Sequence, residues 1–395
     1  MARFEQYDNR DDIYNSSTSS QASLSPPAVL RELAKQCDVR FNGSNPWDIQ
    51  VHHRDVYSQI LTKGSLGFGE SYMDGLWDCE RMDELFYRIM RANIEENLVG
   101  VGKFALILQS LRHRFFNLQT EKRAYQVGEQ HYDIGNDIFE AMLDSTMSYS
   151  CGFWQKANTL EQAQLDKLDL ICKKLQLKPG EKLLEIGCGW GGLASHAAEH
   201  YGVEVLGITI SQEQQKLAQQ RCKGLPVEIR LTDYRDLEGE FDKIVSVGMF
   251  EHVGEKNYPI YFDTVNRLLK KDGLFLLHTI GIYKTIHRVD PWIDKYIFRN
   301  GKLPSAEQIA DVLNKRMVIE DWHNFGQDYA LTLLAWWDRF EAAWPILSEK
   351  YDQRFYRMWK YYLMSCAGFF KSRQGQLWQI VLTKRDRTET YRSIR

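Results

Sequence analysis

A glycine-dense stretch near the middle of the chain has the residue types of a nucleoside-binding turn. Leu-Leu-Glu-Ile at 183–186 is predicted to be a buried strand, and Gly-Cys-Gly-Trp-Gly-Gly follows at 187–192. Gly187 and Gly189 can adopt backbone conformations closed to other residues, so the chain can approach a ligand closely there. A helical pattern comes next, and the N–H groups of its first turn would point at that ligand. The pattern predicts a nucleoside cofactor, although a glycine motif alone also occurs in ordinary structural turns.

The residues around the turn distinguish two classes of cofactor. A dinucleotide site places an acidic residue about 20 residues after the glycines, at the end of the second strand. The second predicted strand here ends at Thr209, and Gln214 follows in the first turn of the next helix. Glu185 before the glycines, and the pair Asp233 and Tyr234 after the third strand, are typical of S-adenosylmethionine (SAM) methyltransferases. Together these residues favour SAM over NAD.

Alternating strands and helices must position these groups. Strands are predicted at 182–186, 204–208, 227–231, 242–247 and 273–279. Helices are predicted at 192–200, 211–222 and 258–270. This order implies an α/β fold with a mostly parallel sheet and helices on both faces. Ligands bind such sheets outside the carboxyl ends of the strands, where Glu251 and His278 also fall.

Composition excludes several classes of protein. The 395 residues are 44% hydrophobic with a net charge of −3, which allows a large core and argues against a nucleic-acid partner. No apolar run is long enough for a transmembrane helix, and the polar N-terminus does not resemble a signal peptide. The seven cysteines lack paired spacing, so we expect neither a metal site nor disulfides, and a cytoplasmic location.

Three regions are predicted along the chain. Residues 1–25 are polar and expected to be disordered, residues 26–120 form a smaller, mostly helical N-terminal domain, and residues 121–395 form the catalytic domain. The glycine-rich segment 64–75 is predicted to be a loop. A helix over 95–116 has broad apolar faces and a basic side. It either packs on its own domain or touches an anionic membrane surface.

Further motifs lie on both sides of the glycine turn. They are Glu-x-His-Tyr-Asp-x-Gly-Asn-Asp at 129–137, Tyr-Ser-Cys at 149–151, Gly-Met-Phe-Glu-His-Val-Gly at 248–254, His-Thr-Ile-Gly at 278–281 and Asp-Pro-Trp-Ile at 290–293. With these motifs the chain resembles the cyclopropane-fatty-acyl-phospholipid synthases and the related mycolic acid cyclopropane synthases. The resemblance covers nearly the whole chain, and segment 64–75 is similar to the bacterial phospholipid-acting branch.

This resemblance implies a class I, Rossmann-like SAM methyltransferase domain and a specific reaction. Enzymes of the family add a methylene from SAM across a cis double bond of an unsaturated phospholipid acyl chain. The alkene attacks the SAM methyl, a base deprotonates the resulting carbocation, and a cyclopropane ring closes. In the family this base is a bound bicarbonate. The resemblance also implies a homodimer that associates peripherally with the inner membrane and uses the N-terminal domain for lipid docking.

The resemblance also implies which side chains form the site. The bicarbonate pocket would comprise Cys151, Glu251, His278, Ile280 and Tyr329. The SAM contacts would comprise Tyr149, Ser150, Glu185, Gly187, Cys188, Gly189, Thr209, Gln214, Asp233, Tyr234 and Arg235. Tyr149 and Ser150 are expected to meet the methionine carboxylate of SAM, and Gln214 the ribose hydroxyls.

Cys366 has two interpretations. The family's cysteine at this position has often been assigned to the active site, so Cys366 is retained as a catalytic candidate. Its motif is apolar and helical, however, and no basic neighbour in it would stabilise a thiolate. We therefore favour a packing or acyl-channel role.

Two other functions remain open. One is a SAM methyltransferase that stops at methyl transfer, and the other is a lipid-binding protein on a degenerate methyltransferase fold. The complete glycine turn and the set Glu251, His278 and Tyr329 argue against both.

Overall fold

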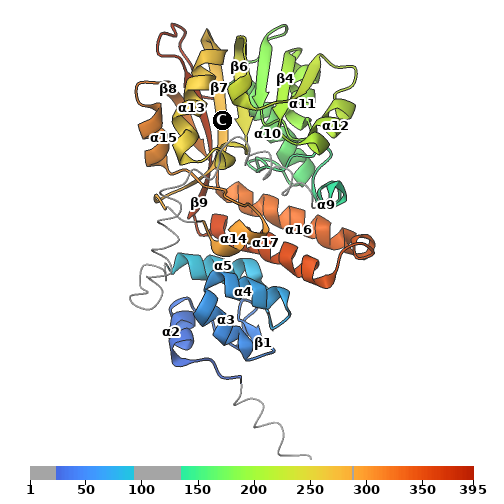
Figure 1. Ribbon diagram of the computed structural model, residues 1–395, viewed down its shortest axis with the longest axis vertical. Coiled ribbons are helices and arrows are strands. Elements are labelled where there is room, and N and C mark those ends of the chain that lie inside the picture. Colours follow the sequence, from blue (N-terminus) through green and yellow to red (C-terminus); the bar gives the residue numbers. More distant parts are fainter. Residues whose placement is uncertain (1–23, 93–134, 287–288) are drawn as a thin grey trace, which may run out of the picture.

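The computed structural model describes residues 24–92, 135–286 and 289–395, and its larger part is built on a seven-stranded sheet. The strand order is β5-β4-β3-β6-β7-β9-β8 (Figure 1). The strands are β3 (Lys182–Ile186), β4 (Glu204–Thr209), β5 (Val227–Leu231), β6 (Phe241–Val247), β7 (Leu269–Ile282), β8 (Val318–Asn324) and β9 (Gly375–Thr383). The first five are parallel, and β9 and β8 add antiparallel pairs beyond β7.

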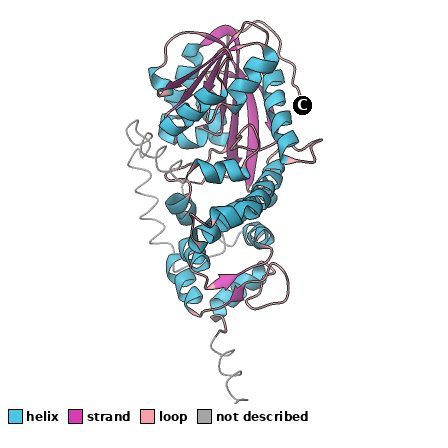
Figure 2. Cartoon of the chain, turned by 90° about the vertical axis from the view of Figure 1, so that its right-hand side faces the viewer, coloured by secondary structure: helices cyan, strands magenta, loops and turns pink. Residues whose placement is uncertain are grey.

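Helices cover both faces of this sheet. One face carries α10 (Leu160–Lys174), α11 (Gly192–Tyr201) and α12 (Gln212–Arg221), and the other carries α13 (Tyr258–Leu268) and α15 (Ala306–Leu313) (Figure 2). Successive strand residues point to opposite faces, so Leu183 packs in the first layer and Leu184 in the second. Because helices bury both faces of the sheet, both sets of strand side chains are apolar, and the strands appear in the sequence as nearly continuous apolar runs. The predicted α/β fold and its five parallel strands are confirmed, while β8 and β9 were not predicted.

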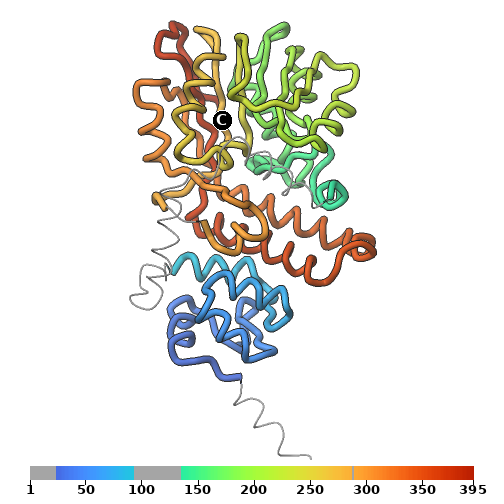
Figure 3. Tube along the Cα trace, viewed as in Figure 1, coloured from blue at the N-terminus to red at the C-terminus, as the bar shows by residue number. Residues whose placement is uncertain are grey.

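A long helical hairpin joins the sheet to the N-terminal helices. It consists of α16 (Gln327–Leu347) and α17 (Gln353–Lys371), which lie between the two parts in Figure 3. The other elements are α2 (Ala28–Gln36), β1 (Gln50–Val51), α3 (Asp55–Lys63), α4 (Ser65–Met73), β2 (Trp77–Asp78), α5 (Met82–Arg91), α9 (Asn136–Met142) and α14 (Pro291–Tyr296). One hydrophobic core includes Phe86 of α5, Tyr361 of α17 and Trp336 of α16. The N-terminal helices therefore share their core with the hairpin.

The glycine-rich segment 64–75 is mostly a helix, and the prediction of a loop was wrong. Helix α4 spans Ser65–Met73, and only the flanking Gly64 and Gly75 have positive φ. Gly67 and Gly69 serve close packing instead. A Cβ on Gly67 would lie 2.1 Å from the carbonyl oxygen of Gln59, and one on Gly69 would lie 2.3 Å from Trp292 Cδ1.

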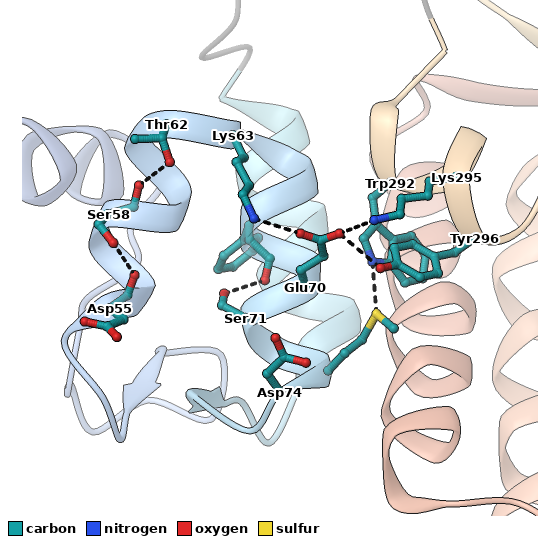
Figure 4. Close-up of polar contacts among 12 residues, drawn as sticks. Asp55, Ser58, Thr62, Lys63, Glu70, Ser71, Asp74, Trp292, Lys295 and Tyr296 are labelled. Atoms are coloured by element: carbon teal, nitrogen blue, oxygen red, sulfur yellow. Dashed lines mark hydrogen bonds and ion pairs between the residues drawn. The ribbon is translucent and has the colours of Figure 1, made fainter.

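Polar contacts fasten α4 to α14 (Figure 4). The Glu70 carboxylate accepts hydrogen bonds from Lys63 Nζ at 3.2 Å, from Tyr296 Oη at 3.0 Å, and from Lys295. Trp292 Nε1 lies 3.3 Å from the sulfur of Met73. These contacts join the N-terminal helices to the segment that follows β7, and so to the carboxyl edge of the sheet.

Several sequence predictions lie outside the described residues. They are the disordered tail up to residue 23, the helix over 95–116 and the first part of the 129–137 motif. Within the described ranges, no helix is both long and apolar enough to cross a membrane.

We expect Gly69→Ala to destabilise the protein by about 1–3 kcal/mol, since the added methyl must displace the fully buried Trp292. The midpoint of urea unfolding measures this effect. Ser65→Ala, at a partly exposed position of the same helix, is the control. An unchanged midpoint for Gly69→Ala would contradict the packing described.

Candidate active site

The glycine turn at the end of β3 is held tightly against β4. The N–H groups of Gly187 and Cys188 both donate to the carbonyl of Ile208, at 3.0 and 2.9 Å. Gly187 and Gly189 have φ of +83° and +52°, which favour glycine. Gly191, with φ +81°, is the N-cap of α11. The turn thus has the backbone that the sequence predicted, with the start of α11 behind it.

The predicted nucleoside contacts follow the next two strands. Thr209 Oγ1 donates to Gln214 Oε1 at 2.8 Å, which fixes the orientation of that amide at the end of β4. After β5, Arg235 forks onto the Asp233 carboxylate through Nε and Nη2, both at 2.7 Å. Tyr234 is buried and its ring packs edge-on against Tyr261. The parallel sheet therefore brings these residues to the same edge as the glycine turn.

The Tyr149–Cys151 segment crosses that edge from outside the sheet. Tyr149 Oη lies 2.7 Å from Tyr362 Oη of α17, and Ser150 Oγ accepts a hydrogen bond from Lys167 Nζ at 3.0 Å. Cys151 is fully buried, and this burial holds the pKa of its thiol well above the ordinary value. Its thiol is therefore a neutral, weak donor at physiological pH.

A buried carboxyl group joins the ends of β6 and β7. Glu251 lies in the 3₁₀ turn η2 (Phe250–His252) after β6, and its Oε1 accepts from the backbone N–H of Ile280 at 2.7 Å. Burial raises the pKa of Glu251 to about 7, and the Ile280 N–H partly opposes this shift. Its other oxygen, Oε2, is buried and has no hydrogen-bond partner among the described residues.

His278 lies on β7, two residues before Ile280, and is almost completely buried. Gln379 of β9 donates from its amide nitrogen to His278 Nδ1 at 3.3 Å. Burial, together with the charges of Lys167 and Lys174, holds the pKa of His278 well below its ordinary value, so the ring is neutral. Since Nδ1 accepts, Nε2 carries the hydrogen, and it too lacks a partner among the described residues.

Tyr329 and Cys366 approach this region from the helical hairpin. Tyr329, near the start of α16, stacks on Phe370 of α17 with ring centroids 4.5 Å apart. Burial, followed by the charges of Cys151, Tyr149, Glu251 and Cys366, raises the pKa of the Tyr329 hydroxyl well above its usual range. Cys366 lies on α17 as predicted, and burial raises the pKa of its thiol to about 12. A thiol that stays protonated at neutral pH is poorly suited to nucleophilic catalysis.

The unpaired atoms define what this edge can do. Glu251 Oε2 is an acceptor and His278 Nε2–H is a donor, and both are buried. A small planar oxyanion with one hydroxyl group can satisfy both, because its hydroxyl donates and its oxygens accept. Bicarbonate fits this donor and acceptor set. A carboxyl group that titrates near neutral pH also suits proton-transfer chemistry.

The structure adds residues that the sequence did not single out. Gln379 orients His278, and Thr332 Oγ1 accepts from the Gly152 N–H and from Trp154 Nε1, at 3.0 and 2.9 Å. Gln164 and Lys167 of α10 both contact Ser150. A polar residue within the apolar run 377–382 was the available signal for Gln379. Helix α10 is rich in polar residues, so Gln164 and Lys167 carried no such signal.

Comparisons with known proteins agree on one family. The family model described as mycolic acid cyclopropane synthetase matches residues 119–380. The cyclopropane-fatty-acyl-phospholipid synthase of Escherichia coli (strain K12) is 55% identical over 356 residues, covering 90% of this chain and 93% of that protein. The tuberculostearic acid methyltransferase UfaA1 of Mycobacterium tuberculosis is 32% identical, covering 85% of this chain and 82% of that protein.

A solved structure agrees with the sequence comparisons. Mycolic acid cyclopropane synthase CmaA1, complexed with S-adenosylhomocysteine (SAH) and CTAB, superposes with a TM-score of 0.61 at 32% identity. The match covers 66% of this chain and 98% of that one.

We expect the stability of the protein to depend on pH through Glu251. The folded pKa of about 7 exceeds the ordinary value of 4.5, so the stability that protonation provides is full at low pH and lost as the pH rises to about 7. The amide in Glu251→Gln cannot ionise. Its free energy of unfolding, relative to the parent protein, should therefore rise by about 1–3 kcal/mol between pH 5 and pH 8.

Urea unfolding at both pH values measures this difference, with exposed Glu204→Gln as the control for a lost surface charge. A difference for Glu251→Gln that is the same at pH 5 and pH 8 would contradict the buried, neutral carboxyl group.

Proposed function

The chain belongs to the mycolic acid cyclopropane synthetase family, and on that premise we propose that it forms cyclopropane rings in unsaturated phospholipid acyl chains, using SAM. The observation that carries the proposal is that Glu251 Oε2, after β6, and His278 Nε2, on the neighbouring β7, are both buried and lack a hydrogen-bond partner among the described residues. Strand β6 adjoins β3, which leads into the SAM-type glycine turn. The similarity to the E. coli phospholipid synthase over 90% of the chain supports the substrate class.

In this proposal the cofactor lies across the ends of β3, β4 and β5. Gly187, Gly189 and the N-terminus of α11 would hold its methionine part, with Ser150 as a hydroxyl donor. Gln214 would meet the ribose and Asp233 the adenine. When bound, SAM supplies the methyl group and bicarbonate the base that removes a proton from it. The chain's own residues bind these groups, orient them and exclude water, which would intercept a cation.

The proposed bicarbonate site uses complementary hydrogen bonds. His278 Nε2–H and the Tyr329 hydroxyl donate to the anion, Cys151 is a weak donor, and Glu251 Oε2 accepts from its hydroxyl. The ionised form of Glu251 only accepts hydrogen bonds and accepts them most strongly, so the proposed role is best served by the carboxylate that forms as the pH rises through about 7. The Ile280 N–H keeps Oε1 occupied, which leaves Oε2 directed to this task.

A second function deserves testing, because UfaA1 is named a methyltransferase and covers most of this chain. An enzyme of that kind would transfer the methyl group without closing a ring. The two activities differ in the fate of one proton, and their products can be separated by spectroscopy.

We further propose that the protein is a cytoplasmic enzyme that associates with the surface of the inner membrane as a homodimer. Its N-terminal region 26–120 would dock on anionic lipid, since the basic face predicted over 95–116 suits such a surface. Light scattering of the purified protein distinguishes dimer from monomer, and a monomer would contradict this assembly.

The main test is incubation of the full-length protein with SAM and vesicles of unsaturated phospholipid, followed by analysis of the acyl chains. We expect the acyl mass to rise by one methylene and proton NMR to reveal upfield ring protons. Branched or exomethylene chains would instead support the methyl-only function. Removing bicarbonate with carbon-dioxide-free buffer should suppress turnover and restoring it should recover turnover. Full activity without bicarbonate would contradict the proposed base.

Membrane docking has its own test. Charge reversal of Lys103, Arg112 and Arg114 should weaken flotation with anionic vesicles, because each basic residue near such a surface contributes about 1 kcal/mol. Zwitterionic vesicles are the control. Unchanged flotation of the triple variant would rule out this helix as the docking surface.

A further inference from the structure

Lys167 is a buried cation for which the proposed chemistry has so far given no role. It lies on α10 with 1% of its surface exposed, and Nζ donates to Ser150 Oγ at 3.0 Å. No carboxylate of the described residues lies within 4.0 Å of this ammonium group. A buried charge without a counter-ion is costly, so such a group is expected to meet an anion in the working protein.

The nearby acidic groups are engaged in other contacts. Asp144 accepts from the N–H groups of Thr146 and Ser148, at 2.9 and 3.0 Å, and from the Thr146 hydroxyl. These bonds commit Asp144 to the turn before the Tyr149–Cys151 segment. Burial raises the pKa of Glu185 to about 8, with the charge of Lys167 opposing this rise, and the two side chains form no ion pair within 4.0 Å.

The cysteine and histidines around Lys167 add no counter-ion. Cys151 is a neutral thiol, because burial holds its pKa well above the ordinary value. His278 and His196 are neutral, since burial lowers the pKa of both. Asp144 therefore compensates the buried charge only from a distance, and no carboxylate of the described residues contacts the ammonium group.

Another lysine of the same helix makes the contrast clear. Lys174 is also fully buried, but its Nζ lies 3.0 Å from His323 Nδ1 and 3.7 Å from the carboxylate of Asp321. Lys174 is thus a paired structural lysine. Among the residues that the structure describes, Lys167 has the Ser150 hydroxyl as its one hydrogen-bond partner.

The bond between Lys167 and Ser150 has a fixed direction. An ammonium group can only donate, so the Ser150 oxygen must accept, and the serine keeps its own hydrogen for another partner. That hydroxyl donates to none of the described residues. Gln164, one turn before Lys167, fixes the segment by donating to the Ser150 carbonyl at 2.8 Å. Ser150 is therefore an oriented donor with a positive charge directly behind it.

We propose that Lys167 is a positioning residue for the cofactor: through the Ser150 hydroxyl it holds the carboxylate at the amino-acid end of SAM. This inference rests on the proposed function, since it assumes that SAM is the ligand of this edge. In this proposal the positive charge that balances the SAM carboxylate comes from Lys167 on α10, and not from the glycine turn.

The direct test compares two ligands that differ in the amino-acid group. SAH carries the carboxylate, and 5′-methylthioadenosine lacks the whole amino-acid group. For Lys167→Gln in the full-length chain, calorimetry should show SAH binding weakened by about 10–100-fold, the usual loss for a charged hydrogen bond. Binding of 5′-methylthioadenosine should stay within about twofold of the parent protein, because it makes no contact with Ser150.

The pH profile gives a second readout. Burial lowers the pKa of Lys167 to about 8, and the charge of Asp144 is the largest effect that opposes this shift. SAH should therefore bind best below pH 8 and more weakly above it, as the lysine loses its proton. The α-amino group of SAH itself also titrates near this pH. The informative quantity is therefore the difference between the pH profiles of SAH affinity for the parent protein and for Lys167→Gln.

Three further variants complete the experiment. Lys174→Gln removes a buried, paired lysine from the same helix and should leave SAH affinity unchanged. Lys167→Arg should restore most of it. Ser150→Ala should weaken SAH selectively, and adding Lys167→Gln to it should cost little more, because the two residues act in one chain of contacts. Should Lys167→Gln fail to fold, Ser150→Ala and Lys167→Arg, each measured with both ligands, carry the test.

Each other outcome overturns the inference. Equal loss of both ligands would make Lys167 merely structural, and loss of neither would make it irrelevant to binding. If Lys167→Gln changed the bicarbonate requirement of turnover but not the SAH affinity, Lys167 would act on bicarbonate and not on the SAM carboxylate. A parent protein that binds neither ligand would instead contradict the proposed function.

Discussion

The active edge of this protein depends on one buried hydrogen bond, from the Ile280 N–H to Glu251 Oε1. This bond joins the turn after β6 to strand β7. It holds the carboxyl group of Glu251 in a buried position, where water does not solvate it. The same bond leaves Oε2 without a partner in the described structure. Burial raises the pKa of Glu251 to about 7, although the hydrogen bond from Ile280 opposes this shift. The protein thus keeps a destabilising group at the place where proton transfer is proposed, as functional sites commonly do.

The surrounding fold keeps this group in place. Strand β7 lies between β6 and β9, so His278 faces Val247 on one side and Gln379 on the other. The helical hairpin closes the site with Tyr329, and its core continues into the N-terminal helices. Glu70 of α4 also hydrogen-bonds to residues of α14, the helix that follows β7. The N-terminal part is therefore packed as part of the structure that surrounds the site.

Much of this arrangement could be predicted from the sequence, because it follows from local patterns. Apolar runs bounded by turns predicted the five parallel strands, and therefore the sheet edge along which Thr209 and Glu251 follow their strands. The helix α4 was missed, since its glycines serve contacts with Gln59 and Trp292 that are distant in sequence. Strands β8 and β9 were missed too, and with them Gln379. Lys167 looked like an ordinary helix lysine, because only the packing of α10 reveals that it is buried.

The most direct test of the account is a carbon-13 NMR titration of labelled bicarbonate with the full-length protein and SAH. The account predicts a bound signal, distinct from free bicarbonate, that is present for the parent protein and lost for Glu251→Gln while SAH still binds. A parent protein that gives only the free signal, or a variant that keeps the bound one, would contradict the assignment of Glu251 and His278 as an oxyanion site.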